Sequence, residues 1–78
     1  MIWIKTQNGD LLECSAIKTK KISEIQYRMT NQDNEILGEY STLKDTQDIV
    51  NRIHSLIIYN GVMYFEMPER KIPGKIKQ

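Results

Sequence analysis

The chain has 78 residues, a single cysteine and a formal net charge of +1 at pH 7, from 11 basic and 10 acidic residues. This length predicts one domain with one small core, because chains of this size bury only about 60% of the surface that they expose when unfolded. One cysteine excludes an intrachain disulfide, and one cysteine with one histidine cannot supply the ligand set of a structural zinc site. We therefore expect no metal and no cofactor, and we expect the chain to gain stability by forming a homo-oligomer.

The lone cysteine is typical of a reducing compartment, so we expect a cytoplasmic protein. No charged segment followed by an apolar one opens the chain, and apolar runs such as residues 56–59 fall far short of the ~20 residues of a membrane span. We therefore expect neither secretion nor a membrane partner. Residues 1–68 are expected to form a single domain, and residues 69–78, rich in lysine, a flexible basic tail.

Alternation of apolar and polar residues predicts strands over residues 1–6, 11–18, 22–30 and 35–40. Asn8 and Gly9 are typical of a hairpin turn between the first two strands. The polar residues 19–21 and 31–34 predict the next two turns, and Ile25, Tyr27 and Met29 share one face of the third strand. The four strands are expected to form an antiparallel meander.

A helix is predicted to begin at Ser41 or Thr42, whose hydroxyl would cap it, with Asp45 in its positively polarised first turn. Asn60 and Gly61 predict its end in the left-handed conformation. A final strand over residues 62–67 would end at Pro68, which gives an α+β fold in the order β-β-β-β-α-β. The apolar residues at helical spacing, which we expect to pack on one face of the sheet, are Leu43, Ile49, Val50, Ile53, Leu56 and Ile57.

The face of the sheet that the helix leaves uncovered is a candidate interface. One helix covers one face, so the other is wet or is covered by something else. If the isoleucines of the first strand face the helix, Trp3 faces away, and the same argument places Leu37 and Leu11 with it, near Lys5 and Arg28. That composition is typical of the centre of an interface. The alternative is that Trp3 folds over a sheet edge and completes the core.

Motifs that carry catalysis are absent from the sequence: it has no nucleophile elbow, no glycine-rich phosphate loop, no Cys-x-x-Cys and no His-x-x-x-His. His54 is expected to be a boundary residue of the helix, partly buried, with Asp48 on another helical face. Cys14 is expected to be a buried, inert thiol. We therefore predict that the protein is not an enzyme. A minor activity centred on His54 is the enzymatic alternative.

Aromatic and arginine side chains are the groups that stack a base and clamp a phosphate. Packing in the core or at a sheet edge is the alternative role for each aromatic residue. Residues 1–68 carry a net negative charge, which argues against polymeric nucleic acid as a partner. The residues of this set are Tyr27, Tyr40, Tyr59, Tyr64, Phe65, Arg28 and Arg52.

Three stretches together resemble a group of small, mostly uncharacterised proteins of Gram-positive bacteria and their phages. They are residues 3–9, residues 37–40 followed by 48–53, and residues 65–69. This sequence has Lys5 where the group is expected to carry arginine. The resemblance implies a phage accessory protein that acts against host defences. It would be either a sponge that sequesters a signalling nucleotide or an inhibitor of a defence protein.

These observations lead to a non-enzymatic, homo-oligomeric binding protein of phage type. Our leading hypothesis is a sponge for a host immune signalling nucleotide, and the alternative is an inhibitor that docks on a host defence protein and blocks it. The nucleotide site would lie at a subunit junction, with arginines on phosphates and aromatic rings on bases. The predicted binding residues are Trp3, Lys5, Arg28, Tyr40, Arg52 and Tyr64.

Overall fold

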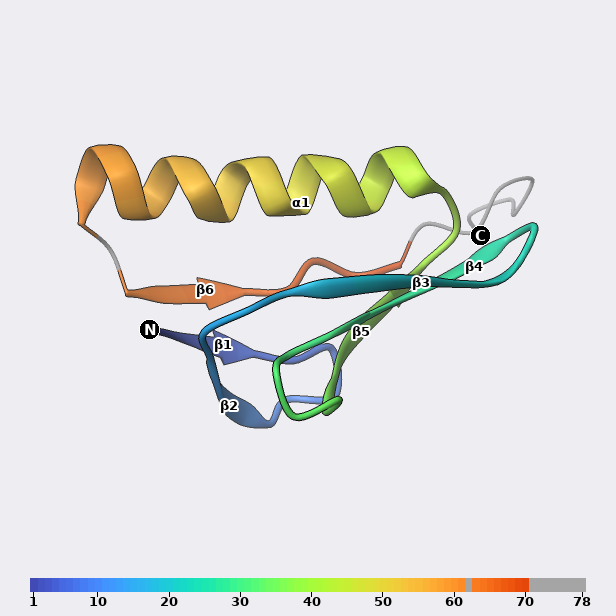
Figure 1. Cartoon of the computed structure of the whole chain (residues 1–78), viewed down its shortest axis with the longest axis horizontal. Coiled ribbons are helices and arrows are strands. Elements are labelled where there is room, and N and C mark those ends of the chain that lie inside the picture. Colours follow the sequence, from blue (N-terminus) through green and yellow to red (C-terminus); the bar gives the residue numbers. More distant parts are fainter. Residues whose placement is uncertain (62, 71–78) are drawn as a thin grey trace, which may run out of the picture.

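The computed structural model describes residues 1–61 and 63–70 (Figure 1). The fold is α+β, as predicted, but the strands of this part of the chain form two three-stranded sheets rather than one five-stranded sheet. We call them the first sheet, in the order β2-β1-β6, and the second sheet, in the order β3-β4-β5. The elements are β1 (Ile2–Lys5), β2 (Leu11–Cys14), β3 (Lys18–Ser23), β4 (Gln26–Thr30), β5 (Ile36–Tyr40), α1 (Leu43–Ser55), the π-helical turn η1 (Leu56–Asn60) and β6 (Tyr64–Glu66).

The first sheet combines a local hairpin with a distant strand. β1 pairs antiparallel with β2 through the predicted turn, in which Gly9 has a φ of +93°. β6 then pairs with β1 in parallel, although most of the chain lies between them. Parallel neighbours need a long crossover, and the second sheet with α1 provides it here. Figure 1 shows β6 running beneath the helix, with β1 and β2 farther from it.

The prediction of one strand over residues 22–30 is wrong, because the chain reverses between Ser23 and Gln26. The amide of Ile25 donates to Ser23 Oγ over 3.3 Å, which stabilises this turn without glycine or proline. Residues 19–21, predicted to be a turn, lie inside β3 instead. β3 is an exposed edge strand, and its lysines are typical of edges that resist pairing with other chains.

Leu37 is buried, so its predicted place on the uncovered face is also wrong. The ladder between β4 and β5 is irregular at Leu37, because Met29 pairs with Gly38 and Thr30 with Ile36. This bulge breaks the alternation of β5 and turns Leu37 and Tyr40 both toward the core. Gly38 allows a close approach, since a Cβ there would meet the Gln7 side chain and the Tyr40 hydroxyl, each at 3.0 Å.

The ends of the helical segment are confirmed. Thr42 is the N-cap, and its hydroxyl accepts from the amide of Asp45 over 3.1 Å. Gly61 follows η1 in the left-handed conformation, with a φ of +64°. The buried face is narrower than predicted, because Leu43, Val50 and Ile57 are exposed.

The core lies between the helix and the inner faces of both sheets, and Gln7 joins the two sheets at its edge. The Gln7 side chain donates to the carbonyl oxygens of Glu39 and Pro68, both over 3.1 Å, and accepts from the amide of Glu39 over 2.8 Å. One side chain thereby ties the end of β1 to β5 and to the segment after β6. The core residues are Ile2, Ile4, Cys14, Met29, Leu37, Tyr40, Ile49, Ile53, Phe65 and Met67.

Part of the predicted basic tail is described by the structure. The Arg70 guanidinium donates to Ser41 Oγ over 3.1 Å and to the carbonyl oxygen of Ile25. Residues 71–78 of the predicted tail, and Val62 of the predicted last strand, lie outside the described residues. No helix over residues 1–61 and 63–70 has the length and apolar character needed to cross a membrane.

Candidate functional site

The outer face of the first sheet carries an ordered grid of side chains, because residues paired across a ladder point to the same side. One row places Trp3 between Glu13 of β2 and Tyr64 of β6. The next row places Lys5 between Leu11 and Glu66. We call these six residues the outer patch. The intervening rows, which contain Ile2, Ile4 and Phe65, are buried, so the alternation of this sheet is regular.

The centre of the outer patch is aromatic and open to solvent. Trp3 is 44% exposed and Tyr64 is 46% exposed, and Leu11 is exposed beside them. Trp3 therefore does not fold over the edge to complete the core. An aromatic pair with a leucine, bordered by one cation and two carboxylates, has the composition of a protein interface centre and its rim.

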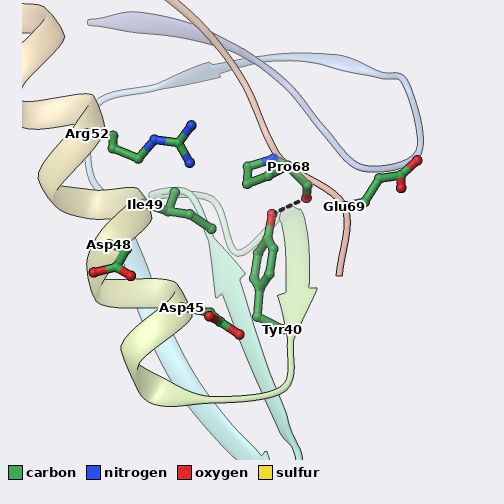
Figure 2. Close-up of a pocket in the computed structure, with 7 residues that line it drawn as sticks. All are labelled: Tyr40, Asp45, Asp48, Ile49, Arg52, Pro68 and Glu69. Carbon is green, nitrogen blue, oxygen red and sulfur yellow. Dashed lines mark hydrogen bonds between the residues drawn. The ribbon is translucent and has the colours of Figure 1, made fainter. Parts of the chain in front are cut away.

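A second candidate is a small hollow between α1 and the segment after β6 (Figure 2). Its volume is about 100 Å³, and Tyr40, Asp45, Asp48, Arg52 and Pro68 are among the residues that line it. The Tyr40 hydroxyl donates to the carbonyl oxygen of Pro68 over 2.7 Å, as the dashed line in Figure 2 marks. Burial raises the pKa of Tyr40 to about 12, so this phenol is a neutral donor at physiological pH.

The size and charge of this hollow do not suit a nucleotide within one chain. Pockets for small ligands usually occupy roughly 300–1,000 Å³. The carboxylates of Asp45, Asp48 and Glu69 line the hollow against the single guanidinium of Arg52, which favours a cation over a phosphate. The guanidinium carbon of Arg52 also lies 5.9 Å from the centre of the Phe65 ring. This cation–π contact holds the Arg52 side chain between α1 and β6.

Arg28 is held by a neighbouring carboxylate. Its Nε lies 2.6 Å from Glu39 Oε2 across the ladder between β4 and β5, and Gln26 donates to the other oxygen of Glu39 over 3.0 Å. A guanidinium in such a charge-assisted pair is partly neutralised. The negative charge of Glu39 would oppose the binding of a phosphate at Arg28.

The predicted site residues therefore lie at three places in one chain. Trp3, Lys5 and Tyr64 share the outer patch, Tyr40 and Arg52 share the hollow beside α1, and Arg28 lies on the outer side of the second sheet. Three of the six are brought together, on the face that the sequence pattern identified.

Cys14 is placed as the sequence predicts, whereas His54 is more exposed than a boundary residue. Cys14 is buried, its thiol donates to the carbonyl oxygen of Ala16, and burial raises the pKa of the thiol, which keeps it protonated and unreactive. His54 is exposed on α1. Among residues 1–61 and 63–70, no cluster of histidine, cysteine or acidic side chains has the arrangement of a metal site.

The residues that hold these sites in place were missed by sequence reasoning. Gln7 follows the first predicted strand and is given no role by the sequence pattern, yet its side chain fixes both Glu39 and Pro68. Glu39 was assigned no role, although it pairs with Arg28. Gly38 is the sequence feature that could have indicated the contact with Gln7, because a glycine inside a strand often marks the close approach of another chain segment.

Comparisons with protein-family models, with curated proteins and with solved structures find no match for this chain.

Proposed function

We propose that this chain is a protein-binding module that docks its outer patch onto another protein. The observation that carries the proposal is the pair formed by Trp3 and Tyr64, which lie side by side in the ladder of the first sheet and are both nearly half exposed. Large aromatic side chains on a rigid sheet bind a partner at a low cost in conformational entropy. The expected partner has an apolar centre and a net positive rim, complementary to Glu13 and Glu66.

The resemblance to phage proteins supplies the class of partner. We propose that the module is a phage-type inhibitor that blocks a host defence protein in the cytoplasm of the infected cell. The exposed aromatic centre and charged rim of the outer patch support binding to another protein through this face.

The nucleotide sponge implied by the same resemblance is the second candidate. It would have to join side chains from several subunits, because Tyr40 is buried and Arg28 is paired within one chain. The inhibitor is favoured because its binding groups already lie together in a single chain.

Photo-crosslinking tests the proposal in the full chain. A photoreactive phenylalanine analogue replaces Tyr64 in the outer patch, and a control variant carries it at Tyr59, which is also exposed but belongs to η1. In defence-carrying Gram-positive cells, we expect position 64 to crosslink to one host protein that position 59 does not capture. With that protein purified, Trp3→Ala should weaken binding by at least ~30-fold, as the loss of an interface hot spot does.

Three outcomes would overturn the proposal that the chain is an inhibitor of a host protein. They are equal crosslinking from both positions, crosslinking of position 64 only to another copy of this chain, or a captured protein whose affinity is unchanged by Trp3→Ala. Calorimetric titration with cyclic nucleotides, giving stoichiometric binding without any host protein captured, would favour the sponge instead.

A further inference from the structure

A line of three exposed apolar side chains runs along one flank of the helical segment, beside its buried face. Leu43, Val50 and Ile57 are 46%, 38% and 39% exposed. They are seven residues apart, which is about two helical turns, so they lie on one side of the helix. We call them the helix stripe. Seven-residue spacing keeps one position of each heptad on the same flank of a helix, and the next apolar position, at Thr46 and Ile53, faces the core of this chain.

The helix stripe borders a second apolar surface. Val50 and Ile57 line a hollow of about 310 Å³ on this flank of the helix, together with Met1, Ile17 and His54. Ile17 belongs to the connection between β2 and β3, so the apolar surface extends from the helix onto the neighbouring segments. An incoming helix would find room for its side chains there.

The charged residues of α1 lie away from the stripe. Asp45, Asp48 and Arg52 line the hollow beside Pro68 on the opposite flank (Figure 2), and Lys44 lies 3.9 Å from Asp48. The Asp, Lys and Arg side chains of α1 therefore lie away from the stripe, and His54 is the titratable side chain of α1 on its flank. An interface related by a two-fold axis sets a surface against its own copy, so it requires a surface that does not repel itself. The helix stripe meets that requirement.

We propose that the helix stripe pairs with the helix stripe of a second copy of this chain, antiparallel and centred on Val50. Val50 is then opposite Val50 of the second copy, and Leu43 is opposite Ile57, since both lie seven residues from the centre. The described part of the chain exposes thirteen large apolar side chains and buries ten in its core, so covering the stripe removes a real excess of apolar surface. This pairing uses a different surface from the outer patch.

Analytical ultracentrifugation over a dilution series tests the pairing with two matched variants. Val50→Lys places two like charges together at the two-fold axis, whereas Ser55→Lys adds the same charge at an exposed position outside the stripe. We expect the native chain and Ser55→Lys to sediment as dimers, and we expect Val50→Lys to raise the dissociation constant by at least ~100-fold. Val50 is already partly exposed, so circular dichroism should show that Val50→Lys remains folded.

Cysteine crosslinking tests the direction of the pairing, in a Cys14→Ser background. Val50→Cys should oxidise readily to a covalent dimer, because the two positions meet at the axis. Leu43→Cys should not, because antiparallel pairing separates its two copies by about 21 Å along the helix. A native chain that is monomeric at every concentration, a dimer that Val50→Lys leaves intact, or efficient crosslinking through Leu43→Cys would each overturn the proposal.

Discussion

At the scale of single residues, Tyr40 connects packing with pH dependence. Its ring is buried in the core and its hydroxyl donates to Pro68, and burial raises its pKa to about 12 from an ordinary value of about 10. The folded state thus keeps the phenolic proton at pH values where the unfolded chain has lost it. By linkage, this contribution is fully present below about pH 10 and is lost as the pH rises toward the folded pKa.

We therefore predict that the free energy of unfolding falls by up to about 3 kcal/mol between pH 10 and 12 through Tyr40 alone. The measurement is chemical denaturation at a series of alkaline pH values. Raised pKa values of Cys14 and Lys21 add to the alkaline loss, so Tyr40→Phe is the control. This variant should lose about 1 kcal/mol at neutral pH, where the hydrogen bond to Pro68 is missing, and should show a shallower alkaline decline. Equal alkaline slopes for both proteins would contradict the assignment.

Gln7 and Gly38 show what residue types alone leave undetermined. A glutamine after a short strand suggests a solvated turn, and nothing near it in the sequence indicates that its amide meets Glu39 and Pro68. Those partners are distant along the chain, so the contact becomes visible only when β5 and β6 have been placed. By contrast, Asn8-Gly9 and the cap at Thr42 were predictable, because their hydrogen bonds join near neighbours.

At the scale of elements, the turn between β4 and β5 is organised by one buried asparagine. Asn31 Oδ1 accepts from the amides of Asp33 and Glu35 over 3.0 and 2.9 Å. Its Nδ2 donates to the carbonyl oxygen of Glu13 over 3.0 Å and to the Glu35 carboxylate over 2.8 Å. The turn is thereby fixed to β2 of the first sheet, as well as to its own strands.

We predict that Asn31→Ala lowers the free energy of unfolding by about 3 kcal/mol, because it removes the four hydrogen bonds of a buried side chain. Asn34→Gly is the matched variant in the same turn. Asn34 has a φ of +63°, which glycine adopts without strain, so this change should be neutral or slightly stabilising. Urea unfolding of both variants measures the difference. Equal losses would mean that the turn conformation, and not the Asn31 side chain, provides the stability.

The hairpin between β3 and β4 explains why the number of strands was predicted incorrectly. Ser23 and Glu24 carry no turn signal as strong as glycine, proline or asparagine, and the residues before them alternate only weakly. An edge strand with both faces wet, such as β3, has no apolar period to detect. The helix was predicted well because its caps and its buried residues are local features, although the same apolar pattern also included the exposed stripe.

At the scale of the whole molecule, the two proposed surfaces lie on different sides of the fold. Figure 1 shows α1 along one side of the sheets and β1 and β2 on the other. The outer patch belongs to the first sheet, on the face opposite the buried residues Ile2 and Ile4, whereas the helix stripe belongs to α1 and η1. A dimer formed through the stripe would leave both outer patches open, so it could bind two partner molecules.

Trp3 makes this separation measurable, because it is the only tryptophan of the chain and it lies in the outer patch. If dimers form through the helix stripe, dilution through dissociation should halve the mass of the particle and leave the emission maximum of Trp3 unchanged. Burial of Trp3 by a protein partner should move the emission to shorter wavelength, as removal of water from the ring requires. Val50→Lys, which is expected to be monomeric, should give the emission of the native dimer and serves as the control.

An emission maximum that moves to longer wavelength as the native chain dissociates would place Trp3 between the two copies. The outer patch would then be the surface of self-association, and the helix stripe would be left for a different protein.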